Sequence, residues 1–346
     1  VTVDGGISWS RFENNLPRVG IRDMVIHPRD HALVMASHGR GVIILDDITP
    51  LRQLTPEITE NDLYFFETEP TVLKDPGSGT SWYSGAGNFV GANPDESAKI
   101  VYYMKKRHTF GKMYLEISDS EGNFIREAPA GKSAGINIVE IPIRSRKPKA
   151  PPTNNRMALV GSLFGPSLPA GTYKVKLIKG KDTYDSQFEL TYDSNSPYSD
   201  EDRKTQYEYT RKLYNMTEDL AYIYYVLQEM TTQAKSRAES DKKQSKKLLA
   251  FAEITEKLAS SLVSLSGDFY VDEGEEIGEL ISQLYRYVSS YPGKPSDSQI
   301  DQAEILDDKL DAVKEKFEVL STVNLQKIND RLLKNDHQPI SYLPKE

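Results

Sequence analysis

The stretch Thr2-Val3-Asp4-Gly5-Gly6-Ile7-Ser8-Trp9 decides how the N-terminal part of this chain is interpreted. The carboxylate of Asp4 can accept hydrogen bonds from backbone N–H groups a few residues further on, and this chemistry favours a tight turn. We expect the indole of Trp9 to pack between strands. The stretch therefore predicts a strand–turn–strand unit in which five residues have structural roles: Thr2, Asp4, Gly6, Ser8 and Trp9.

These residues fit the Asp-box pattern S/T-x-D-x-G-x-S/T-W, which lies on a tight turn between two strands of a β-propeller blade. A blade buries its faces only against neighbouring blades, and single repeats are not stable. We therefore expect the rest of the propeller to lie upstream of this chain. Most of any catalytic centre of that propeller would lie upstream as well.

Composition narrows the classes of protein to which the chain could belong. Of its 346 residues, 38% are hydrophobic and 27% are charged, which is ordinary for a soluble globular protein. The net charge of −8 without a basic block disfavours nucleic acid and anionic membranes as partners. No apolar run reaches the ~18 residues of a membrane span. The sequence has no cysteine, which excludes disulfides, thiolate catalysis and cysteine-ligated zinc. No cofactor is expected.

The residue pattern divides the chain into successive regions and predicts a multidomain protein with β and α parts. Residues 1–54 read as the end of a β-propeller, and residues 55–97 as a linker with a glycine- and serine-rich loop at 76–91. Alternating strands over 98–193 predict an immunoglobulin-like β-sandwich, with an exposed basic and proline-rich excursion at 144–155. Residues 199–338 predict an antiparallel four-helix bundle.

Two patterns carry most of these predictions. In the β part, Val42-Ile43-Ile44-Leu45 reads as a buried strand. In the helical part, apolar residues recur every three or four positions, as at Leu213, Met216, Leu220, Ile223 and Leu227. The serine and glutamine of Ser296-x-x-Gln299 form a capping-box signature, which predicts the start of the last helix.

Taken together, the chain resembles the C-terminal part of large bacterial Asp-box (BNR-repeat) propeller proteins, which are often labelled sortilin-like or glycosyl-hydrolase-like. The resemblance covers nearly the whole chain and is specific in combination, although residues 95–97 depart from the family pattern. Besides the Asp box, it rests on the strings at 37–52, 89–94, 100–103, 169–173 and 288–295. It implies an exported bacterial protein that is periplasmic, surface-bound or secreted.

Two pairs of residues are candidates for binding. His38 and Arg40 flank Gly39 in a predicted tight turn, where they could reach a ligand at the propeller rim. A structural role, in which Arg40 ties strand ends together, is the favoured alternative. Trp82 and Tyr83 lie in the glycine-rich loop, where aromatic rings could stack on a sugar or a partner protein. The favoured alternative is that Trp82 folds back onto the protein.

No catalytic or metal-binding residue is predicted. Asp46 and Asp47 are adjacent on a predicted strand, so their side chains point to opposite faces and cannot flank one glycosidic bond. We expect Asp47 to stabilise a turn, and Asp46 to pair with Arg40 or Arg52. Pro28 lies between His27 and His31 and disfavours a helix that would present both to a metal.

Three functions remain open at this point. The first is a non-catalytic C-terminal portion of an exported propeller protein that supports binding of a polysaccharide or a protein. The second is a buttress for a glycoside hydrolase whose catalytic carboxylates lie upstream. The third is an assembly module that docks a partner through the helical bundle. Two carboxylates on facing upstream loops would favour the enzyme.

Overall fold

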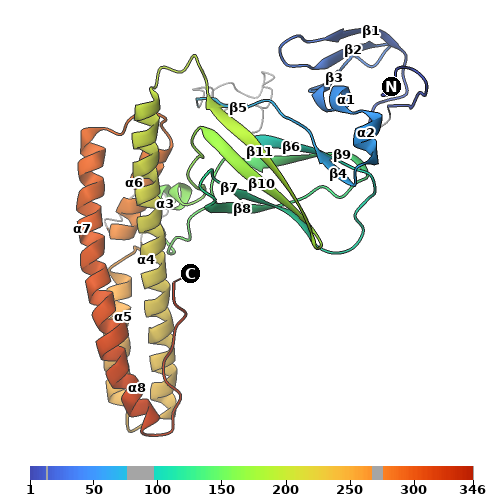
Figure 1. Ribbon diagram of the computed structural model, residues 1–346. Helices are drawn as coiled ribbons and strands as arrows, with labels where there is room; N and C mark the ends of the chain where they lie inside the picture. Colours follow the sequence, from blue (N-terminus) through green and yellow to red (C-terminus); the bar gives the residue numbers. More distant parts are fainter. Residues whose placement is uncertain (13–14, 76–96, 267–275, 346) are drawn as a thin grey trace. The chain divides into compact units, whose positions relative to one another are not determined.

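The computed structural model describes residues 1–12, 15–75, 97–266 and 276–345, and it divides into two compact units (Figure 1). Of the described residues, the first unit holds 1–74, 97–143 and 170–193. The second unit holds residue 75, 144–169 and the chain from 194 onward. The protein thus combines sheets and helices, with the sheets confined to the first unit and the long helices to the second.

The first unit begins with a three-stranded antiparallel sheet in the order β1-β2-β3. Its strands are β1 (Ile21–Ile26), β2 (Leu33–Ser37) and β3 (Val42–Leu45). Two short helices follow, α1 (Thr49–Gln53) and α2 (Pro56–Glu60). Each has a proline in its first turn, where the missing N–H removes no helical hydrogen bond.

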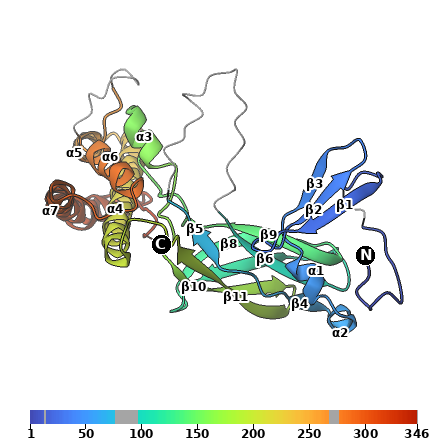
Figure 2. The same ribbon diagram turned by 90° about the horizontal axis from the view of Figure 1, so that it is seen from above.

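Two further sheets make up the rest of the first unit. One has the order β4-β6-β9, and the other, which curls, has the order β5-β11-β10-β7-β8 (Figure 2). The strands are β4 (Leu63–Phe65), β5 (Thr71–Leu73), β6 (Ser97–Met104), β7 (Met113–Ser118), β8 (Phe124–Pro129), β9 (Gly135–Pro142), β10 (Gly171–Lys179) and β11 (Asp182–Tyr192). Residues 63–65 and 71–73, expected in a linker, therefore belong to sheets.

Alternating burial gives each of these two sheets one apolar face. Leu115 and Ile117 of β7 are fully buried, as are Leu177 of β10 and Ile141 of β9. Tyr102 of β6 is fully buried too, and its hydroxyl donates to the carbonyl oxygen of Gly131 at 2.6 Å. Burial raises the pKa of Tyr102 to about 12. The core of the first unit therefore lies in these two sheets.

Besides the short helix α3 (Arg156–Gly161), the described residues of the second unit form five longer helices, where four were predicted. They are α4 (Asp200–Ser240), α5 (Ser245–Ser260), α6 (Ile277–Ser289), α7 (Asp297–Val319) and α8 (Leu325–Leu333), with the π-helical turn Leu320–Asn324 between the last two. Both α4 and α7 begin with a capping box, formed by Ser199 with Asp202 and by Ser296 with Gln299. The box predicted at Ser296 is confirmed.

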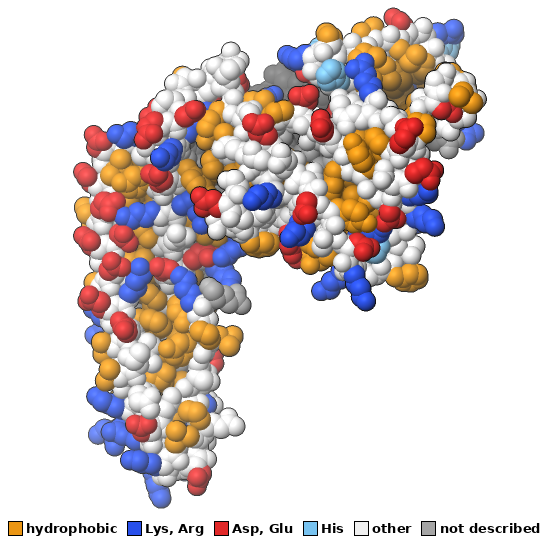
Figure 3. Space-filling view, viewed as in Figure 1, with side chains coloured by type: hydrophobic (Ala, Val, Ile, Leu, Met, Phe, Trp, Pro, Cys, Tyr) orange, Lys and Arg blue, Asp and Glu red, His pale blue; other side chains and the backbone are white. Residues whose placement is uncertain are grey.

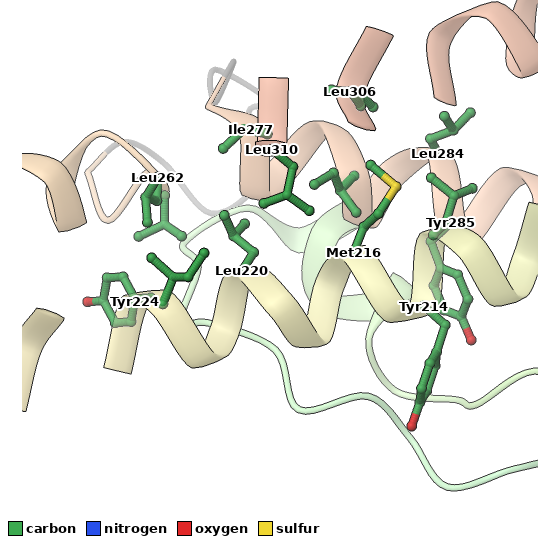
Figure 4. Close-up of a cluster of buried hydrophobic side chains, with 14 of the residues drawn as sticks. Tyr214, Met216, Leu220, Tyr224, Leu262, Ile277, Leu284, Tyr285, Leu306 and Leu310 are labelled. Atoms are coloured by element: carbon green, nitrogen blue, oxygen red, sulfur yellow. The ribbon is translucent and has the colours of Figure 1, made fainter. Parts of the chain in front are cut away.

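The apolar seams of these helices meet in a common core. Figure 4 shows Met216 and Leu220 of α4 among side chains of α6 and α7, including Leu284 and Leu310. A second cluster, toward α5 and α8, includes Met230, Phe251, Ile328 and Leu332. The apolar seams of these helices are therefore buried against other parts of the same unit, while some apolar side chains outside the seams, such as Leu249 and Ile305, stay exposed.

Residues 144–155, expected to be an exposed excursion, instead pack within the helical unit, together with residues 156–169. Arg146 makes two hydrogen bonds to the carboxylate of Glu218 on α4, at 2.7 and 2.6 Å. The short helix α3 (Arg156–Gly161) lies against α6, where a Cβ on Gly161 would come within 2.4 Å of the carbonyl oxygen of Ser282. Polar groups in this proline-rich stretch thus have partners that its composition does not reveal.

Glu279 on α6 holds the same stretch from inside the unit. Its side chain is fully buried, and Oε1 accepts from Thr153 Oγ1 at 2.7 Å and from the amide of Ser264 at 3.1 Å. Oε2 is buried and has no hydrogen-bond partner among the residues that the structure describes. Burial raises the pKa of the Glu279 carboxyl, because the charged form is poorly solvated there.

Candidate functional site

The sheet β1-β2-β3 is apolar on both faces. Its register places Met24 opposite Met35 and Met35 opposite Ile43, so these three side chains share what we call the methionine face. The same register places Val25 opposite Val34 and Val34 opposite Ile44. With Val42, they form what we call the valine face. An antiparallel sheet with one solvated face normally alternates apolar and polar residues, so this pattern is typical of a sheet covered on both sides.

Much of this apolar surface is exposed. The exposed fraction is 59% for Val25, 64% for Val42 and 58% for Ile44 on the valine face, and 60% for Met24 on the methionine face. Figure 3 shows apolar side chains gathered at the surface over this sheet. The strand predicted to be buried at 42–45 is therefore not buried within the described residues. Surfaces of this kind mark sites where another protein element packs.

The turn over residues 2–9 is held by the side chain of Asp4. Its Oδ1 accepts from the Thr2 hydroxyl at 2.7 Å and from the amide of Ile7 at 3.1 Å, and its Oδ2 accepts from the amide of Ser8 at 3.0 Å. Gly6 has a φ of 94°, which favours glycine. Hydrogen bonds from the Ser8 and Thr2 hydroxyls hold the pKa of Asp4 well below its ordinary value. This carboxylate is therefore occupied, and it stays charged at neutral pH.

Trp9 differs from the expectation that it packs between strands, because 73% of it is exposed. Ile7, on the same turn, is 89% exposed. The turn itself is closed by a hydrogen bond from the amide of Ser10 to the carbonyl oxygen of Val1 at 2.9 Å. The turn thus forms from local hydrogen bonds, while its apolar side chains are left without a covering layer in the described part of the chain.

His38 and Arg40 lie in the turn between β2 and β3. Gly39 and Gly41 have φ values of 75° and 68°, and the Ser37 amide donates to the carbonyl oxygen of Gly41 at 3.0 Å. His38 Nδ1 lies 3.3 Å from a guanidinium nitrogen of Arg22 on β1, and Arg40 is exposed. Sequence reasoning missed Arg22. The pairing of Ile21 with Ser37 places Arg22 beside this turn, and that register is known only from the structure.

Asp46 and Asp47 were expected on a strand, but they follow β3, which ends at Leu45. Asp47 Oδ1 accepts from the amide of Thr49 at 2.8 Å, which starts α1 in the turn role expected for it. The expected pairing of Asp46 is not seen among the described residues: Arg52 instead approaches His31, with 3.4 Å between the two nitrogens. His27 lies 3.2 Å from Asp30 Oδ2, and Arg29 binds the same carboxylate.

Trp82 and Tyr83 lie outside the described residues. Within the described ranges, no group of three His, Asp or Glu side chains could hold a metal ion. In that same part of the chain, no helix is both long and apolar enough to cross a membrane. Neither known family models nor curated proteins give a match to this chain.

Proposed function

We propose that this chain is a non-catalytic C-terminal portion of an exported Asp-box β-propeller protein. The observation that carries the proposal is the sheet β1-β2-β3, which is apolar on both faces and whose valine face is largely exposed, as is Met24 on the methionine face. A propeller blade is covered on both faces by its neighbours. In this proposal the exposed faces of the sheet, together with Trp9 and Ile7, contact adjoining blades.

The remaining parts would then extend and support the propeller. We interpret the sheets β4-β6-β9 and β5-β11-β10-β7-β8 as an immunoglobulin-like sandwich, because each has one buried face and their strands alternate in burial. We interpret the helices of the second unit as an antiparallel bundle. The family resemblance adds that the protein works outside the cytoplasm of a bacterium and binds a polysaccharide or another protein.

A binding role agrees with the chemistry of the candidate residues better than a catalytic one. The carboxylates of Asp4 and Asp47 both accept hydrogen bonds from their own turns. Arg22, His38 and Arg40 are hydrogen-bond donors at one end of the sheet and are suited to contact a polar ligand. We expect the chain to have no glycosidase activity on xyloglucan or related polysaccharides.

Cysteine labelling tests the proposal, because the chain has no cysteine of its own. V42C places a thiol on the valine face, and E315C, at an exposed position of α7, serves as the control. Each variant is made in this chain and in a protein extended by the coding sequence upstream of Val1. We expect the thiol at 42 to react at least ten times more slowly in the extended protein, with the control unchanged. Equal rates at position 42 in both proteins would contradict the proposal.

A further inference from the structure

Residues 337–345 run back along the helical unit from the end of α8 in an extended conformation (Figure 1). Asp336, with a φ of 58°, turns the chain after α8. Pro339 and Pro344 lack an N–H and cannot continue a helix. The segment pairs with no strand of the described residues, so the partners of its backbone groups are either water or side chains.

Side chains of α4 and α8 supply several of those partners. Arg237 on α4 donates to the carbonyl oxygens of Gln338 and Pro339, at 2.7 and 2.9 Å. Asn329 on α8 donates to the carbonyl oxygen of Ile340 at 2.9 Å and accepts from its amide at 2.8 Å. Gln233 on α4 does the same for Ser341, at 2.8 and 3.2 Å. We call Gln233, Arg237 and Asn329 the backbone clamp.

The clamp contacts main-chain atoms, so these contacts do not depend on the side chains of the bound segment. An amide side chain carries a donor and an acceptor together, and it can therefore satisfy the N–H and C=O of one residue in the way a neighbouring strand does. The one buried apolar side chain of the segment is Ile340, which is 2% exposed and packs in the cluster with Ile328 and Leu332.

Acidic side chains lie at both ends of the segment. His337 Nε2 is 3.3 Å from the buried carboxylate of Asp241, and Lys345 is paired with Asp219. Asp219 also pairs with Lys314 at 3.1 Å. The bound segment is thus an extended peptide with one branched apolar residue near its centre and a basic residue at either end.

We propose that the backbone clamp is a recognition site for an extended peptide of this kind, and that residues 337–345 are its resident occupant. The bound segment closes the site until a competing segment displaces it. Proteins that recognise extended peptides often bind the backbone through hydrogen bonds and hold a side chain in an apolar pocket, so that few positions of the peptide are fixed in sequence. The occupant in this chain shows the chemistry that a partner segment needs.

Opening the site in the full-length chain tests the proposal. I340D places a carboxylate where the anchor is buried and should release the segment while the helices remain. A fluorescent peptide with the sequence of residues 337–345 is titrated into this variant, with circular dichroism confirming its helices. We expect saturable binding that is at least ten times tighter than to the wild-type chain, where the resident segment competes. No binding to a folded I340D chain would overturn the proposal.

A charge change in the backbone clamp distinguishes specific binding of the peptide from non-specific binding. In the I340D background, N329D keeps the shape of Asn329 but replaces its donor with an oxygen that repels the carbonyl of Ile340 in the peptide. The control is Q326E, which makes the same charge change one turn earlier on α8 at an exposed position. We expect N329D to weaken binding of the peptide at least tenfold and Q326E to leave it within twofold. Equal effects of the two changes would overturn the proposal.

Hydrogen exchange on the wild-type chain gives a test that depends on no variant. The amides of Ile340 and Ser341 are both bonded to clamp side chains, so we expect their exchange to be slowed at least tenfold relative to the free peptide. An excess of unlabelled peptide should reduce that protection as it displaces the resident segment. Exchange as fast as in the free peptide would overturn the proposal.

Discussion

The N-terminal sheet and the helical unit use apolar residues in opposite ways. In the helices, Leu213 and Leu227 are fully buried against other parts of the same unit. In the sheet, Val42 and Ile44 are more than half exposed. At roughly 25 cal/mol per Å² of buried apolar area, the helices gain stability from their own sequence. The sheet can gain as much only when another element covers it.

The largest effect is expected from a charge in the helical core. Leu248 and Leu249 are neighbours on α5, with 1% and 48% of each exposed. L248D should lower the free energy of unfolding of the helical unit by about 4 kcal/mol or more, because a carboxylate replaces a well-packed apolar group. L249D, the matched control, should change it by less than about 1 kcal/mol. Chemical denaturation followed by circular dichroism measures both, and equal losses would refute the self-contained core.

A pH-dependent effect of intermediate size is expected from Glu279. Its pKa is raised in the folded protein, so folding retains a proton that the unfolded chain releases. The stability that the protonated carboxyl provides is complete below the unfolded pKa and is lost as the pH rises through the folded pKa. In that window the free energy of unfolding should fall by up to about 1.4 kcal/mol per pH unit.

E279Q should flatten this dependence, whereas E253Q, at an exposed position of α5, should not. Urea unfolding of the three proteins at a series of pH values above 4 provides the measurement. An unchanged slope in E279Q would show that the buried carboxyl does not titrate as its environment predicts.

A smaller and local effect is expected in the turn over residues 2–9. D4A removes the acceptor for the amides of Ile7 and Ser8 and should free both amides to exchange with solvent. The pKa of Asp4 is lowered in the turn. The stability that its carboxylate gives the turn is therefore present above the ordinary aspartate pKa, and it is lost as the pH falls through the lowered value. Amide exchange by NMR reports both effects. D46A is the control, and slow exchange of Ile7 and Ser8 in D4A would contradict the role given to Asp4.

The smallest effect is expected on the valine face. I44K replaces an exposed apolar side chain with a charged one, and in this chain it should change the free energy of unfolding by no more than about 0.5 kcal/mol. The same substitution in a protein that covers this face should be strongly destabilising. Thermal unfolding of I44K beside L248D compares the two regions directly. A large loss for I44K in this chain would show that the valine face is already packed.

Local patterns predicted much of the secondary structure. The capping box at Ser296 and Gln299 was predictable because both hydrogen bonds close within four residues. The strand at 42–45 was predictable from its apolar run, but its exposure was not, because burial depends on what lies next to the strand. The exposure of Trp9 could not be predicted for the same reason, because it depends on what lies next to the turn.

Contacts between distant residues were the part that sequence reasoning missed. Thr153 meets Glu279 and Arg146 meets Glu218, and nothing local in the proline-rich stretch indicates either partner. The backbone clamp is a similar case, because Gln233 and Asn329 are ordinary helical residues until the fold brings residues 340 and 341 between them. Of the binding candidates, His38 and Arg40 could be placed from their glycine-flanked turn, while the contact of His38 with Arg22 depends on strand register.

Native-state hydrogen exchange tests the contrast between the two regions most directly. The amides of β2, the central strand of the N-terminal sheet, are compared with those around Leu220 in α4. If the sheet depends on a covering layer for its stability, the opening free energy of β2 should be lower than that of α4 by about 3 kcal/mol or more, a difference above a hundredfold in exchange rate. Equal protection of β2 and α4 would contradict the account.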